Sequence, residues 1–89
     1  MRIRGTIMKD NRWQKEETVS IEDMNLPRTR KVYQALNEIC YLLDLAVPIW
    51  LDSNKKEFIR HARTKFRKDN FIEQISFDYL DFQVVEEDW

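Results

Sequence analysis

The spacing of hydrophobic and polar positions predicts two strands at the start of the chain. Over residues 2–8, apolar or small side chains alternate with more polar ones, which is the period of a half-buried strand. Residues 10–12 have the composition of a turn, and residues 13–21 form a second extended stretch. We therefore expect these two segments to form a β-hairpin.

A helical spacing follows. From Pro27 to about Asp44, apolar residues recur at steps of four, three and four, at Val32, Leu36, Ile39 and Leu43. This stripe is typical of the buried side of an amphipathic helix, and a proline is tolerated in a helix's first turn. Cations stand in that first turn, where the helix dipole disfavours them, at Arg28, Arg30 and Lys31.

The next apolar stretch, Leu45 to Leu51, contains Pro48, which prevents the helix from simply continuing. We interpret it as a buried connector that closes one end of the core. A second helix is predicted to begin at Asn54, because a glutamate three residues later completes a capping-box pattern. Its apolar stripe is Phe58, Ala62 and Phe66.

A final strand is predicted over residues 77–85, where apolar and polar residues alternate again. The predicted fold class is α+β, a small two-layer domain of order β-β-α-α-β, with a mostly antiparallel three-stranded sheet covered on one face by two helices. Pairing the last strand with the first is expected to place Asp78, Asp81 and Glu86 near Arg2 and Arg4.

The composition agrees with one small domain spanning residues 1–89. The chain has 89 residues, of which 43% are hydrophobic and 12% aromatic, so one core is expected to form without disulfides. It contains a single cysteine, no apolar run near the length of a membrane span and no N-terminal apolar signal region. We therefore expect a cytoplasmic protein with no membrane partner.

Charge is sorted sharply along the second half of the chain. Residues 55–68 carry seven basic side chains against one acid, and residues 69–89 carry seven acids and no lysine or arginine. This order fits a cationic binding face, and it fits equally two oppositely charged elements that neutralise each other in the fold. The net charge of −1 argues against a surface devoted entirely to nucleic acid.

On a continuous second helix, four cations at steps of four, three and four form one ridge: Lys56, Arg60, Arg63 and Arg67. These are the candidate residues for binding a partner or phosphate, because clustered arginine and lysine bind phosphate backbones. Charge runs are more often solvated surfaces, so the ridge has an ordinary structural interpretation as well. A helix-turn-helix motif is disfavoured by the long connector before this helix.

No pattern in the sequence predicts a catalytic, cofactor or metal site. His61 lies four residues after Glu57, as a base and its orienting acid would on a helix, but no nucleophile accompanies them. Cys40 falls beside an apolar stripe, where a buried thiol acts as a small hydrophobe. The acids before Trp89 are interpreted as a solubilising end that frays, and Trp89 itself is expected to dock on the domain or on a partner.

Part of the sequence resembles a group of small, uncharacterised bacterial single-domain proteins. The resemblance rests on Pro48-Ile49-Trp50-Leu51, Asn54, Glu57-Phe58, the segment 66–73, and Phe77-Asp78. It implies a stand-alone bacterial cytoplasmic domain and carries over no site residue, because the group has no assigned activity.

The sequence therefore favours a small non-catalytic interaction module that binds another protein or its own copy through exposed aromatics and an unpaired sheet edge. The alternative is a nucleic-acid-binding accessory domain that uses the basic face of the second helix. No cofactor and no small-molecule substrate is predicted.

Overall fold

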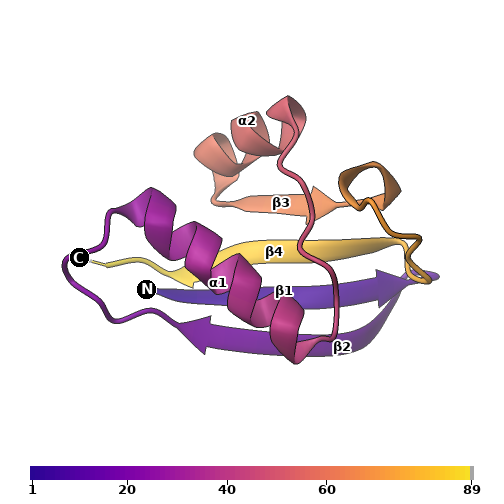
Figure 1. The fold of residues 1–89 in the computed structure, drawn as a ribbon, viewed down its shortest axis with the longest axis horizontal. Helices are drawn as coiled ribbons and strands as arrows, with labels where there is room; N and C mark the ends of the chain where they lie inside the picture. Colours follow the sequence, from indigo (N-terminus) through magenta and orange to yellow (C-terminus); the bar gives the residue numbers. More distant parts are fainter. Residues whose placement is uncertain (89) are drawn as a thin grey trace.

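The computed structural model describes residues 1–88 and has the predicted α+β class (Figure 1). Its elements, in chain order, are β1 (Arg2–Lys9), β2 (Arg12–Ser20), α1 (Arg28–Leu42), α2 (Asp52–His61), β3 (Arg63–Phe66), the short 3-10 helix η1 (Lys68–Asn70) and β4 (Tyr79–Glu86). The prediction of a three-stranded sheet is wrong. The sheet has four strands in the order β2-β1-β4-β3, and every neighbouring pair is antiparallel.

The predicted hairpin is present as β1 and β2. Asp10 and Asn11 connect the strands, and both have positive φ, 53° and 60°. Two-residue hairpin loops favour this backbone, and Asp and Asn adopt it more readily than most residues. The register shifts between Ile7 and Met8, so the hairpin contains a bulge near its tip.

The predicted pairing of the last strand with the first is confirmed, although its ion pairs differ in part. Arg2 lies opposite Glu86, and their side chains are 3.6 Å apart. Arg4 instead contacts Glu16 and Gln83. The other two acids have different partners. Asp78, just before β4, accepts the Asp10 N–H, and Asp81 of β4 binds Arg63.

The hydrophobic core lies between one face of the sheet and the two helices. All four positions of the predicted stripe on α1 are buried, and sheet residues such as Ile3, Leu80 and Phe82 face them. At Gly5 the approach is so close that a Cβ atom would lie 2.5 Å from Cγ2 of Ile39. Phe58 of α2 stacks on Phe82 at 5.8 Å, so both helices cover the same face.

The second helix is much shorter than predicted. It ends at His61, because Ala62 adopts the left-handed conformation with φ 53° and ψ 33°. The chain then extends as β3 along β4, where Thr64 and Phe66 are fully buried. The Ala62 carbonyl accepts the Val84 N–H at 2.9 Å, which compensates for the hydrogen bond that helix continuation would have made.

A buried amide network joins the start of α2 to β3 and η1. The helix begins at Asp52, two residues before the predicted start, and Asn54 accepts the Leu51 N–H at 3.1 Å from inside the first turn. The amide of Asn54 donates to Thr64 Oγ1 at 2.9 Å, and Asn70 donates to Asn54 Oδ1 at 2.6 Å. Glu57, the predicted partner in the capping box, instead accepts the Lys65 N–H at 3.3 Å.

The connector between α1 and α2 is only partly buried. Pro48 is buried, and Leu45 and Trp50 pack against the core. The other residues between Leu45 and Trp50, which are Ala46, Val47 and Ile49, are exposed. Asn70 holds the connector in place, because its carbonyl accepts the Ile49 N–H and its amide donates to the Ile49 carbonyl, both at 2.7 Å. In Figure 1 the connector crosses from the end of α1 to the start of α2.

Candidate interaction surfaces

A groove of about 210 Å³ lies between the first turns of α1 and the outer side of α2. Aromatic and aliphatic side chains form most of its wall, and the complete lining is Arg28, Thr29, Val32, Tyr33, Trp50, Lys55, Phe58 and Ile59. It is open on the solvent side, where Ile59 is 84% exposed and Tyr33 45% exposed. Exposed apolar side chains that gather around a groove are typical of interaction sites.

Trp50 forms the base of this groove. Its indole packs edge-to-face on Tyr33 at 6.0 Å, on Phe58 at 5.4 Å and on Phe66 at 4.9 Å. These perpendicular contacts are among the preferred geometries of aromatic pairs. Because Phe66 belongs to β3 and Phe58 to α2, the connector residue Trp50 joins the groove to the core.

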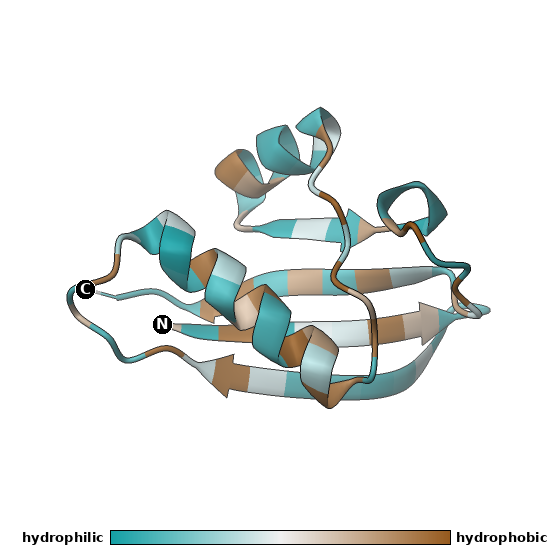
Figure 2. Ribbon diagram, viewed as in Figure 1, coloured by the Kyte–Doolittle hydropathy of each residue, from teal (hydrophilic) through white to brown (hydrophobic). Residues whose placement is uncertain are grey.

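Apolar side chains are also exposed on the helices and the connector around the groove. Val47, Ile49 and Leu51 alternate with the inward-facing Pro48 and Trp50. The connector has hydrophobic colouring over much of its length in Figure 2. Of the eleven large hydrophobic residues that are exposed among residues 1–88, seven belong to α1, the connector or α2: Tyr33, Tyr41, Leu42, Val47, Ile49, Leu51 and Ile59.

The charged side chains that line the groove are both cations. Lys55 forms no ion pair with any residue of the described chain, and Arg28 lies over the Phe58 ring at 5.5 Å. The Trp50 Nε1–H is buried and has no hydrogen-bond partner within residues 1–88. Buried donors usually have an acceptor, so this N–H is an exception among the described residues.

Two of the three cations in the first turn of α1 are explained by the acidic segment after β4. Arg28 forms two hydrogen bonds with Glu87, at 3.0 and 2.8 Å, and Lys31 forms an ion pair with Asp88. Hydrogen bonding to Arg28 lowers the pKa of Glu87, and hydrogen bonding to Lys31 lowers the pKa of Asp88. Residues 86–88 are therefore held by partners, contrary to the expectation of a frayed end. Trp89 lies outside the described residues.

The prediction that the four candidate cations form one helical ridge is wrong. Lys56 and Arg60 lie on α2, whereas Arg63 lies in β3 and Arg67 follows it. The cause is the left-handed Ala62, which ends the helix between the two pairs. Arg63 also forms two hydrogen bonds with Asp81, so part of the basic segment is neutralised by the acidic one.

The sheet face opposite the helices carries cations beside aromatic rings. The register places Trp13, Met8 and Tyr79 in one row across three strands. Trp13 is 61% exposed, and Lys65 Nζ lies 4.7 Å from the centre of the Tyr79 ring. Arg67 lies over the same ring at 5.9 Å, which is within the range of a cation–π contact.

The other residues considered for chemistry are His61, Glu57 and Cys40. His61 is exposed at the end of α2 and lines a surface hollow together with Glu57, whose carboxylate accepts the Lys65 N–H at 3.3 Å. Cys40 is buried, and burial raises its pKa to about 12, so the thiolate that reactivity requires is suppressed. Residues 1–88 contain no cluster of three or more metal-ligating side chains of the His, Cys, Asp or Glu type.

Comparison with protein families, with curated proteins and with solved structures finds no match to this chain. The resemblance to small bacterial proteins therefore stays a prediction. Within residues 1–88, neither helix has the length and apolar character needed to cross a membrane.

Sequence reasoning missed the groove because its parts come from separate elements. Tyr33 is on α1, Trp50 is on the connector and Ile59 is on α2. One signal was present in the sequence, since apolar residues continue through every position from Leu45 to Leu51. A segment of that kind in an extended conformation must expose alternate side chains.

Proposed function

We propose that this protein is a small non-catalytic module that binds another protein through the groove between α1 and α2. The ligand is an acidic segment of the partner that carries an apolar side chain as its anchor. The observation that carries this proposal is the exposed apolar lining of the groove, in which the charged members are Arg28 and Lys55.

The residues that line the groove fit both the apolar anchor and the acidic residues of the proposed ligand. Apolar side chains around a hollow favour an anchor residue that is desolvated on binding, which is the usual origin of affinity at protein interfaces. Lys55, which forms no ion pair within residues 1–88, favours a carboxylate beside that anchor, and Arg28, already paired with Glu87, adds a second cation to the wall. Two copies of this groove facing each other would bring like charges together, so an acidic partner fits better than a symmetric dimer.

The experiment is a selection of random peptides displayed on phage against the intact protein, followed by titration of the selected peptides. Enriched peptides are expected to contain a Leu, Phe or Trp flanked by Asp or Glu. Ile59→Asp is expected to weaken their binding by at least about tenfold, because it places a carboxylate among the apolar groove residues.

Ile72→Asp is the matched control. Ile72 is 87% exposed, as open as Ile59, and it does not line the groove. Enrichment of basic peptides, no enrichment, or equal weakening by both substitutions would overturn the proposal. Sedimentation that shows a concentration-dependent dimer, lost in Ile59→Asp, would also overturn it, because a second copy would then occupy the groove.

A second candidate function is binding of single-stranded nucleic acid on the open face of the sheet. The row of Trp13 and Tyr79 with Lys65 and Arg67 beside it favours this candidate. Bases stack on exposed aromatic rings, and nearby cations attract the phosphates. Three acids on the same face, Glu16, Asp81 and Glu86, weaken the attraction.

Fluorescence anisotropy with labelled single- and double-stranded DNA and RNA across a salt series tests this candidate. Lys65→Gln with Arg67→Gln changes the sheet side, and Lys56→Gln with Arg60→Gln changes the same number of charges on α2. Binding that weakens steeply with salt and is lost only in the first double variant is the expected result. Loss only in the second would place the site on α2, and no binding at low salt would rule out both.

A further inference from the structure

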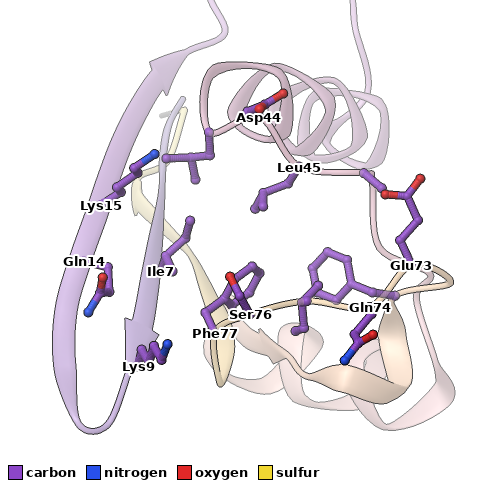
Figure 3. Close-up of a pocket in the computed structure, with 14 residues that line it drawn as sticks. Ile7, Lys9, Gln14, Lys15, Asp44, Leu45, Glu73, Gln74, Ser76 and Phe77 are labelled. Carbon is purple, nitrogen blue, oxygen red and sulfur yellow. The ribbon is translucent and has the colours of Figure 1, made fainter.

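A cavity in the described part of the chain lies away from the groove and from the open sheet face. It has a volume of about 400 Å³, which is within the range of small-molecule sites. It is bounded by the tip of the β-hairpin, the end of α1 and residues 71–77 (Figure 3). Ile7, Leu45 and Phe77 form an apolar floor.

The polar side chains that line this cavity are exposed and have no side-chain partner within the described residues. None of them forms an ion pair or a side-chain hydrogen bond with another residue of the described range 1–88. The set is Lys9, Gln14, Lys15, Asp44, Glu73, Gln74 and Ser76. By contrast, Arg28, Lys31 and Arg63 each form an ion pair with an acid of the same chain.

The charged side chains on the cavity wall are Lys9, Lys15, Asp44 and Glu73, and Figure 3 shows Asp44 at the end of α1, between Lys15 and Glu73. Lys9 and Lys15 come from the hairpin, and Figure 3 shows them on the opposite side of the cavity from Glu73. The bulge between Ile7 and Met8 is what adds Gln14 to the same wall as Lys15. Bulges often turn side chains toward a binding site in this way.

We propose that this cavity binds a small zwitterion whose two charges are separated by an apolar body, as in a dipeptide. Its carboxylate lies toward Lys9 and Lys15, and its ammonium lies toward Glu73. The apolar body covers Ile7 and Phe77, and the amides of Gln14 and Gln74 match the hydrogen-bonding groups of a peptide bond. This site is independent of the proposed protein-binding groove, with which it shares no lining residue.

The experiment is a titration of the ¹⁵N-labelled protein with L-leucyl-L-phenylalanine, followed in ¹H–¹⁵N correlation spectra. Shifts are expected at the hairpin tip, at residues 43–46 and at residues 71–77. N-acetylation or C-amidation of the dipeptide is expected to weaken binding by about tenfold, because each removes one charged hydrogen-bonding group. 6-Aminohexanoate, which separates its charges without a peptide bond, tests whether charge separation alone is sufficient.

Variants locate the effect. Lys15→Gln is expected to weaken binding of the free dipeptide and to leave binding of its C-amide unchanged. Glu73→Gln is expected to weaken binding of the free dipeptide and to leave binding of its N-acetyl form unchanged. Ala46→Trp, at an exposed position of the lining, is expected to block the cavity. Lys56→Gln is the control on α2. Equal binding of capped and free dipeptides, shifts centred outside the cavity, or no shifts up to the solubility limit would overturn the proposal.

Discussion

The strands of the sheet and helix α2 differ in how their cations are paired. On the open face of the sheet, each of Arg2, Arg4 and Arg63 has an acidic partner on a neighbouring strand. On α2, Lys55, Lys56 and Arg60 have no ion-pair partner among the described residues. The difference is one of geometry, since strands lie side by side at a short spacing and place opposite charges in register, whereas α2 has no neighbour on its outer side.

The pairing of cations affects how much free energy a ligand gains when it binds at each place. A paired cation on the sheet must give up its partner before it binds a new anion, and an exposed pair costs little to form or break. At the groove, Lys55 would gain its first ion-pair partner while an apolar anchor of the ligand is removed from water. The helical side is therefore the better candidate for a stable interface.

The largest expected effect comes from breaking the amide network that holds the helical side to the sheet. Asn54→Ala is expected to lower the free energy of unfolding by about 3 kcal/mol, because it leaves buried groups of Thr64 and Asn70 without a partner. Urea unfolding measures the loss. Asn37→Ala, at an exposed position of α1, is the control and is expected to stay within about 0.5 kcal/mol. A loss below about 1 kcal/mol for Asn54→Ala would show that the network is not needed.

The next effect concerns the close approach of the sheet to α1. Gly5→Ala is expected to cost about 1–3 kcal/mol in the free energy of unfolding, because its Cβ would lie 2.5 Å from Cγ2 of Ile39. Combining it with Ile39→Leu, which removes that branch at constant volume, is expected to cost less than the sum of the two single substitutions. Additive costs in this double-mutant cycle would mean that the contact with Ile39 is not the cause.

A smaller effect on the free energy of unfolding is expected at low pH. The pKa values of Glu87 and Asp88 are lowered in the fold, so the unfolded chain binds more protons as the pH falls. Their stabilisation is present above about pH 5, near and above the ordinary carboxyl pKa values, and is lost as the pH falls through the folded values. Unfolding midpoints measured down the pH scale are expected to fall less steeply in Glu87→Gln with Asp88→Asn. An unchanged slope would mean that other carboxyl groups control the acid response.

The smallest expected effects are those of exposed residues on the two sides. A double-mutant cycle on Arg63 and Asp81 is expected to give a coupling of about 0.2–1 kcal/mol, the usual range for an exposed ion pair. Ile59→Ser is expected to change stability by less than about 0.5 kcal/mol while weakening binding at the groove. Thermal unfolding measures the Arg63–Asp81 coupling and the stability of Ile59→Ser. A large loss of stability in Ile59→Ser would indicate a structural role for that side chain.

The hairpin and α1 were predictable because local signals agree there. Alternation, turn residues and a regular apolar stripe all indicate the same elements. β3 was not predictable, because Phe58, Ala62 and Phe66 satisfy a helical stripe in the sequence while the structure ends the helix at the second of them. No glycine or asparagine marks this left-handed position, and the compensating hydrogen bond comes from Val84, far along the chain.

The candidate sites were less predictable than the fold. The cations at 56, 60, 63 and 67 were identified as a group, but their grouping depended on a helix that continues past Ala62. The buried thiol of Cys40 was predicted correctly, because its position on α1 determines its environment. The groove and the cavity depend on contacts between distant segments, which no local pattern contains.

The order of strands in the sheet has a consequence for synthesis on the ribosome. β4 lies between β1 and β3, although it is the last of the four strands to be made. The hairpin can form as soon as residue 20 has emerged, but β3 has no strand to pair with until residues 79–86 follow it. During that interval the edge of β1 that pairs with β4 has no partner, and Phe66 lacks its contact with Phe82, so the nascent chain is most open to wrong associations in the last steps before β4 inserts between its two neighbours.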